Sequence, residues 1–167
     1  MTATGKPRAG EITSRTAARI AAVQALYQMD MAGTDVNDVI AEFIEQRFEG
    51  DNRDETLATA DRVFFADILR AVLRRQREID PMIDEQLATG WRLVRVDSIL
   101  RAILRAGVAE ILDRSDVPAR VAINEYVNVA HVFFDDDEPR VVNGVLDKLA
   151  RRLRGHEFVS KRATPSS

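Results

Sequence analysis

The chain of 167 residues contains no cysteine, and its apolar residues never form a long uninterrupted run. Without cysteine the protein has no disulfide, no thiolate metal site and no cysteine nucleophile. No apolar run approaches the roughly 20 residues that a membrane-spanning helix needs, and the opening MTATGKPRAGEITSR lacks the apolar middle of a secretory signal. We therefore expect a cytosolic protein, and the 46% content of hydrophobic residues supports one folded domain.

Strand patterns are also missing, because no segment alternates apolar and polar residues for long enough. The apolar residues recur instead at spacings of three and four, which predicts an all-α protein with about seven helices. Thr34 or Asp35 can cap the second helix and Asp97 a later one, and the residue before Pro81 is expected to end a helix. Residues 96–113 are apolar on most sides, so this helix is expected to lie at the centre of the fold.

Motifs for catalysis and cofactor binding are absent as well. The two histidines, His131 and His156, have no partner at metal-ligand spacing. The acidic run from Asp135 to Glu138 lacks the alternating oxygen ligands and central glycine of a calcium loop, and carboxylates before Pro139 suit the start of a helix. There is no phosphate-binding loop, dinucleotide fingerprint or nucleophile elbow. We therefore expect a binding protein without catalytic residues, cofactor or metal.

The charges are unevenly distributed along the chain. The formal net charge is −3, but residues 1–20 carry +3 and residues 148–167 carry +5, which leaves −11 for residues 21–147. Basic ends on an acidic body are typical of proteins that bind a polyanion locally. On charge alone, the alternative that basic termini only keep the ends of the chain solvated is equally well supported.

Several stretches together resemble one known family. They are ARIAAVQALYQMD near the start, ILRAILRAGVAEIL in the middle, and RSDVP, VAINEYV and VNGVLDKLA near the end, in this order and spacing. In these stretches the chain is similar to the NusB family of bacterial transcription antitermination factors. The resemblance covers residues 13–154, which are expected to form a compact helical bundle of two subdomains. Residues 1–12 and 155–167 are expected to be disordered tails.

The resemblance to the NusB family implies a function and a set of partners. It implies that the chain joins NusE, a small-subunit ribosomal protein, to hold the boxA element of nascent ribosomal RNA and to help RNA polymerase read through terminators with other Nus factors. It implies no catalytic activity and no cofactor, and it leaves open a monomer or a homodimer. The alternative is a helical protein-binding module that does not touch RNA. The same domain also resembles the start of a ribosomal RNA cytosine methyltransferase, for whose catalytic domain we expect no room.

The resemblance also implies that an arginine-rich start of the first helix holds RNA, and the matching positions are Arg15 and Arg19. These arginines continue the helical stripe that later holds Leu26, so the apolar face gives way to cations in the first turns. We expect both to lie outside the packed interior, where guanidinium groups can fork onto adjacent phosphate oxygens. The alternative is that both pair with nearby carboxylates such as Glu11.

Three further positions match RNA-contacting parts of the family. Tyr27 is expected to present its ring or hydroxyl to a base, although core packing with a hydrated hydroxyl is a second interpretation. Arg140 is expected to take a phosphate. Asp137 would repel a phosphate, so it is expected to restrain non-specific binding or to cap the last helix. Val141 stands where a relative has an aromatic residue, which removes one stacking surface.

The stretch VNGVLDK places a glycine inside the last predicted helix. Glycine inside a helix costs up to about 1 kcal/mol, so it is tolerated where another helix must approach closely. We therefore predict a packing role for Asn143 and Gly144.

Overall fold

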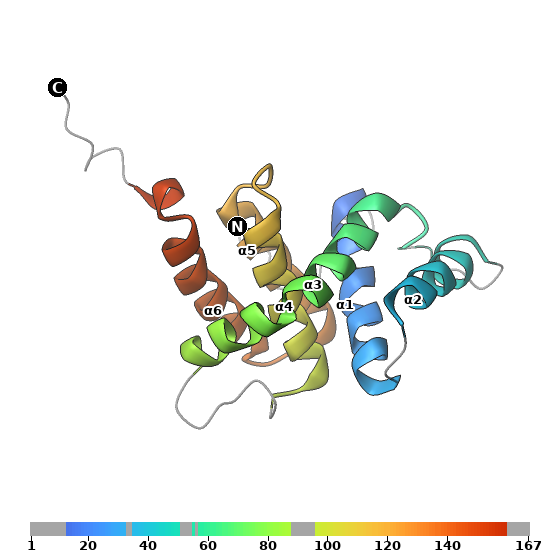
Figure 1. Ribbon diagram of the computed structural model, residues 1–167, viewed down its shortest axis with the longest axis horizontal. Coiled ribbons are helices and arrows are strands. Elements are labelled where there is room, and N and C mark those ends of the chain that lie inside the picture. The colour runs from blue at the N-terminus through green and yellow to red at the C-terminus, as the bar shows by residue number, and fades with distance from the viewer. Residues whose placement is uncertain (1–12, 33–34, 51–54, 56, 88–95, 160–167) are drawn as a thin grey trace.

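The computed structural model describes residues 13–32, 35–50, 55, 57–87 and 96–159. These residues form helices and no strand, which confirms the all-α fold class. In the described residues there are six α-helices (Figure 1), with a π-helical turn (η2) after the second of them and a short 3-10 helix (η4) after the last. In chain order the elements are α1 Ser14–Ala32, α2 Val36–Phe43, η2 Ile44–Glu49, α3 Arg62–Gln86, α4 Ser98–Asp113, α5 Ala119–Phe133, α6 Glu138–Leu153 and η4 Gly155–Phe158.

Helix α3 accounts for the difference from the expected number of helices. It runs without a break through Pro81, so the boundary predicted there is wrong. Proline inside a helix removes one backbone hydrogen bond, and this usually costs about 3 kcal/mol. Ile79 and Ile83 flank Pro81 and are fully buried, while Pro81 itself is exposed. The apolar face of the helix therefore stays packed on both sides of the proline, and this burial offsets the lost bond.

Aspartate side chains begin three of the helices. The carboxylate of Asp35 accepts a hydrogen bond from the Asn37 amide at 2.9 Å. Of the two residues predicted to cap α2, Asp35 is therefore the one that does so. Asp97 caps α4 as predicted, accepting from the Ile99 amide at 2.8 Å. Asp61 caps α3 by accepting from the Phe64 amide at 2.9 Å. Each of these bonds satisfies an amide that the first turn of the helix leaves free.

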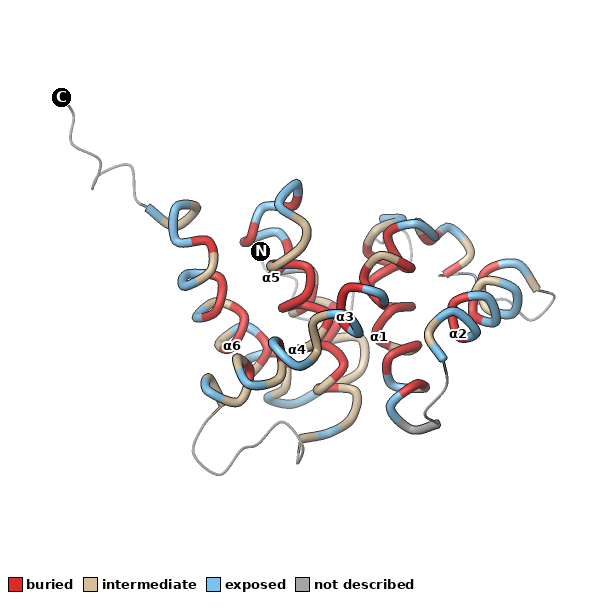
Figure 2. The backbone as a smooth tube through the Cα atoms, in the orientation of Figure 1, coloured by how far each residue is buried: buried red, intermediate tan, exposed pale blue. Residues whose placement is uncertain are grey.

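Helix α4 lies at the centre of the fold, as its apolar composition predicts. It packs against α1, α3, α5 and α6, and its residues are mostly buried in the tube of Figure 2. A close approach is made at Gly107, where an added Cβ atom would lie 2.7 Å from a terminal methyl of Leu146 on α6. Glycine at this position therefore lets α6 pack directly against the backbone of α4.

The close approach expected at Gly144 is absent. A Cβ atom added at Gly144 would meet no atom within 4 Å among the described residues, and Asn143 beside it is exposed. The packing role predicted for the VNGVLDK stretch is therefore wrong for these two residues. The small residue that the contact needs is on the partner helix, at Gly107.

Buried Arg154 fixes the C-terminal end of the helical domain. Its guanidinium donates to the carbonyls of Ile111 at 2.9 Å and Arg114 at 2.7 Å, at the end of α4. In η4, the Glu157 carboxylate accepts from the Ala119 amide at the start of α5. That bond is the main reason why the pKa of Glu157 lies below its ordinary value. Residues 155–158, expected to belong to a disordered tail, therefore form η4 instead, while residues 1–12 and 160–167 lie outside the described residues.

Among the described residues, no helix is both long enough and apolar enough to cross a membrane. The cytosolic location expected from the sequence stays a prediction.

The two glycines predict opposite effects of the same substitution. Gly107→Ala should destabilise the fold by about 1 kcal/mol, because the cost of displacing buried Leu146 exceeds the gain in helix propensity. Gly144→Ala should stabilise it by about 0.5–1 kcal/mol, because the new methyl meets open space. Urea denaturation of the two variants beside the parent chain measures both changes. Equal shifts in the same direction would contradict the assignment of the close approach to Gly107.

Candidate nucleic-acid interface

Arg19 lies in the packed interior, contrary to the prediction. Its side chain is 4% exposed, and its Nε donates to Glu110 Oε1 at 2.9 Å while a terminal nitrogen bonds the second oxygen of that carboxylate. The other terminal nitrogen donates to Glu125 Oε1 at 2.9 Å. Arg19 on α1 thus meets one carboxylate from α4 and one from α5. The expectation that Arg19 faces solvent and RNA is wrong. The packed helices exclude water from its side chain, and the two carboxylates balance its charge.

Neighbouring polar groups complete this buried network. Thr16, one turn before Arg19, donates from its hydroxyl to Glu125 Oε1 at 2.6 Å. Burial acts to lower the pKa of Arg19, but the hydrogen bond and the negative charge of Glu110, with Glu125, raise it above the ordinary arginine value. Arg19 therefore stays charged, and the network ties the start of α1 to α4 and α5.

Arg15 remains accessible, one turn before Arg19. Its side chain is 41% exposed, and its closest carboxylate contacts within the described part of the chain are Asp116 at 3.5 Å and Asp61 at 4.0 Å. Its guanidinium carbon lies 4.5 Å from the centre of the Phe64 ring, which supports the side chain from below. These contacts are longer and more hydrated than those of Arg19. Arg15 can therefore exchange its carboxylate partners for a phosphate. The alternative partner Glu11 lies outside the described residues.

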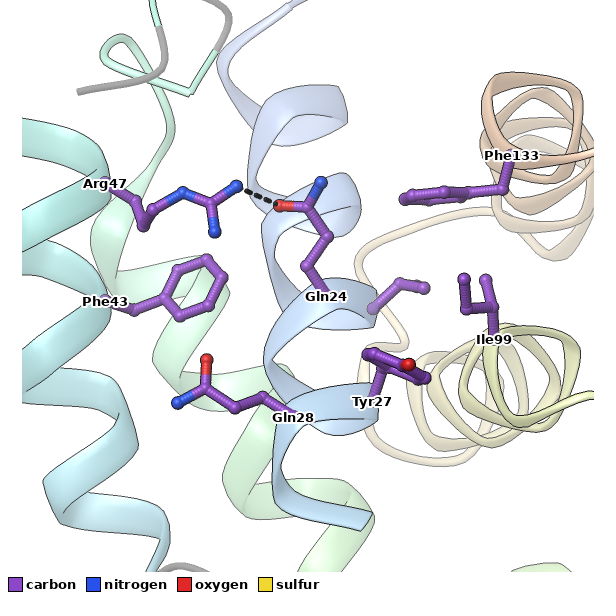
Figure 3. Close-up of a pocket in the computed structure, with 8 residues that line it drawn as sticks. Gln24, Tyr27, Gln28, Phe43, Arg47, Ile99 and Phe133 are labelled. Atoms are coloured by element: carbon purple, nitrogen blue, oxygen red, sulfur yellow. Dashed lines mark hydrogen bonds between the residues drawn. The ribbon is translucent and has the colours of Figure 1, made fainter. Parts of the chain in front are cut away.

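Tyr27 lines a groove of about 550 Å³ beside α1. Figure 3 shows Tyr27, Ile99 and Phe133 on one side of this helix and Phe43 and Arg47 on the other. Tyr27 is 39% exposed, so it is not a packed core residue. The helices that build the groove are α1, α2, α4 and α5, together with η2. The groove therefore forms only when all of these segments are assembled.

Arg47 and Phe133 are groove residues that the sequence did not reveal. Arg47 donates to the side-chain oxygen of Gln24 at 3.2 Å, as the dashed line in Figure 3 marks, and its guanidinium lies 5.1 Å from the Phe43 ring centre. Phe133 is half-buried in the last turn of α5. Of the three rings that line the groove, Phe43 is buried, and the more accessible rings of Tyr27 and Phe133 together with the Arg47 cation suit a stacked base and its phosphate. Apolar spacing alone could not distinguish Phe133 from core residues.

Asp137 and Arg140 are exposed at the start of α6, shortly after Phe133 in the chain. The main-chain carbonyl of Asp137 accepts from the Arg140 amide at 3.0 Å, but its carboxylate makes no capping bond. Asp137 thus occupies the cap position without using its side chain there, and this leaves the carboxylate facing water. Arg140 is not among the residues that line the groove, and a connection of a few residues links it to Phe133.

Comparisons with known proteins agree on one family. The model of the NusB family matches residues 16–151. The transcription antitermination protein NusB of Rhodopseudomonas palustris strain TIE-1 is 49% identical over 158 residues, which cover 95% of this chain and 89% of that protein. The NusB protein of Rhizobium rhizogenes strain K84 is 52% identical over 141 residues, which cover 84% of this chain and 88% of that protein.

Solved structures share the arrangement of the helices. T. maritima NusB superposes with a TM-score of 0.72 at 24% identity, covering 87% of this chain and 97% of that one. A structure of the antitermination factors NusB and NusE in complex with dsRNA gives a TM-score of 0.66 at 24% identity, covering 82% and 96%. At a sequence identity of 24%, the structural similarity establishes that these proteins share a fold and no more than that.

The burial of Arg19 predicts that alanine substitutions at Arg19 and at Arg15 lower the stability of the fold by unequal amounts. Arg19→Ala should lower the free energy of unfolding by about 3–5 kcal/mol, because it leaves Glu110 buried without its cation. Arg15→Ala should change it by about 1 kcal/mol or less, because Arg15 is half-exposed and loosely paired. Thermal and urea denaturation of both variants measure the difference. A mild effect of Arg19→Ala would show that the guanidinium is solvated.

Proposed function

Because the chain belongs to the NusB family of transcription antitermination proteins, we propose that it holds the boxA element of nascent ribosomal RNA together with NusE. The complex would promote read-through by RNA polymerase together with other Nus factors. The observation that carries this proposal is an accessible cation and an accessible aromatic ring on one helix, Arg15 and Tyr27, in a chain of this family. A solved structure with this fold contains NusB, NusE and RNA, which supports the same partners here.

Each residue then has a distinct role on the RNA surface. Arg15 and Arg140 would neutralise phosphates, which positions RNA without reading its sequence. Tyr27 and Phe133 would stack bases in the groove, and Arg47 would add a cation beside them. Asp137 would disfavour RNA strands that follow another path. Arg19 supports this surface from within, because it fixes the helix that carries Arg15 and Tyr27.

The second candidate function is protein binding without RNA contact. The observation that favours it is the loss of Arg19 from the surface, which leaves Arg15 beside two carboxylates. Filter binding of boxA RNA and of a scrambled RNA, each with and without NusE, separates the two functions. Mass determination of the free protein and of the NusE complex decides between a monomer and a homodimer.

Phosphate contact by Arg15 and Arg140 predicts a change in salt dependence. Each contact to a single strand contributes about 0.7 to the slope of log K against log salt, so Arg15→Gln with Arg140→Gln should lower that slope by about 1.4. RNA binding is measured by fluorescence anisotropy over a salt series with NusE present. A control with the same change of charge is Arg74→Gln with Arg77→Gln, two exposed arginines of α3. An unchanged slope in the first pair would count against the phosphate contacts.

Base stacking by Tyr27 predicts a difference between two substitutions. Tyr27→Ala should weaken RNA binding by about 1–3 kcal/mol, which is the range for one stacked base, whereas Tyr27→Phe should keep most of the affinity. Anisotropy titrations at one fixed salt concentration measure both. If Tyr27→Phe loses as much as Tyr27→Ala, the hydroxyl and not the ring makes the contact.

A further inference from the structure

The C-terminal end of the domain carries cations that the groove does not use. Arg120 at the start of α5 and Arg151 near the end of α6 are both exposed, and each guanidinium carbon lies 4.7 Å from the centre of the Phe158 ring in η4. Lys148, one turn before Arg151, is also exposed. One arginine from α5 and one from α6 thus lie on the same aromatic ring, and we name Arg120, Lys148 and Arg151 the C-terminal cationic surface.

Stacking on Phe158 prepares the two arginines for an anion. A guanidinium that lies on a ring is held by its planar face, and its N–H donors remain at its edge. Less side-chain entropy is then lost when a phosphate binds, because the ring already restricts both side chains. The two guanidinium carbons are no further apart than the sum of their distances to the ring centre. One short stretch of sugar-phosphate backbone can reach both.

The carboxylates near this surface are already engaged. Asp147 accepts from Arg151 Nε at 2.9 Å, but this is an exposed pair within one helix and is worth only a fraction of 1 kcal/mol. Glu157 is bonded to buried Arg154 and to the Ala119 amide. Glu85 pairs with Arg152. Among the described residues, neither Arg120 nor Lys148 forms an ion pair, so the surface has a positive excess on a chain whose net charge is negative.

The same face of α6 connects this surface with Arg140. Arg140 and Arg151 are eleven positions apart, which is about three turns, so they share a face with a rise of about 16 Å between them. The outer side of α6 is exposed along its length (Figure 2). Gly144 lies between them, and nothing in the described chain occupies the space beside it. The carboxylate of Asp147 lies on the same face and pairs with Arg151, so a backbone that reaches Arg140 can continue along α6 past this one paired carboxylate.

We propose that the C-terminal cationic surface holds the sugar-phosphate backbone of the RNA beyond the segment in the groove. The proposal rests on the proposed function for the first contact at Arg140 and adds a second, sequence-independent one. Continuity with Arg140 favours RNA over an acidic protein segment, because a nucleic acid presents phosphates at regular intervals along a path of this length. Phosphate contacts fix the course of the strand and leave sequence reading to the groove.

The test compares three double variants in the full chain with NusE present. Arg120→Gln with Arg151→Gln removes two phosphate contacts, Arg120→Lys with Arg151→Lys keeps both charges, and Arg74→Gln with Arg77→Gln is the control for net charge. The probes are boxA RNA, the same RNA extended at both ends, and a scrambled RNA of the extended length. Anisotropy titrations over a salt series give the affinity and the salt slope. Thermal melting shows whether Phe158 still packs.

The expected result is specific to the first variant pair. On the extended RNAs the glutamine pair should lower the salt slope by about 1.4 and weaken binding several-fold, equally for boxA and scrambled sequences. The lysine pair should keep most of the salt slope, because a phosphate contact depends mainly on the positive charge. This holds even if the variant melts at a lower temperature than the parent chain. The control pair should leave the slope unchanged.

Several results would overturn the proposal. An unchanged slope with the glutamine pair, or an equal fall with the control pair, would show that the surface makes no local RNA contact. Loss of NusE binding with RNA affinity retained would assign the surface to a protein. If the slope falls with Arg15→Gln and Arg140→Gln but not with the Arg120 and Arg151 pair, the proposed function stands and this inference fails. If the parent chain binds no RNA, both fail.

Discussion

The buried contact between Arg19 and Glu110 is the constraint on which the RNA surface depends. Both side chains are buried away from water, so they cannot move apart without leaving an unpaired charge in an apolar interior. Glu125 adds a second carboxylate from another helix. The start of α1 is therefore fixed against both α4 and α5, which sets where Arg15 and Tyr27 emerge from the same helix.

Arginine has three different roles in this small fold. Arg19 joins helices through carboxylates, and Arg154 joins α4 to η4 through backbone carbonyls at a helix end, where the helix dipole favours a cation. Arg15, Arg120 and Arg151 lie on aromatic rings with part of the guanidinium in solvent. Arg19 also lies on a ring, 4.8 Å from the centre of Phe64, so it is burial and not stacking that separates the arginines of the scaffold from those that can offer donors to an outside anion. Burial and partner geometry separate these roles, since the side chain is the same in all of them.

Much of the fold could be predicted because it depends on local patterns. The spacing of apolar residues identified the helices, and Asp35 and Asp97 cap helices at predicted positions because capping needs only neighbouring residues. The predicted break at Pro81 failed because burial of Ile79 and Ile83 outweighs a local backbone penalty. The packing role predicted for Gly144 failed because the pattern identifies a small residue but not which helix faces it.

The sequence by itself determined that this chain is helical, that α4 is central and that the chain resembles the NusB family. Those conclusions follow from helical periodicity and from motifs that are contiguous in the chain. Only the tertiary structure decided that Arg19 is buried while Arg15 is accessible, and that Arg47 and Phe133 share a groove with Tyr27. The partners of Arg19 are about a hundred positions away, at Glu110 and Glu125. Whether an arginine faces water depends on such distant carboxylates, and no spacing within one helix encodes them.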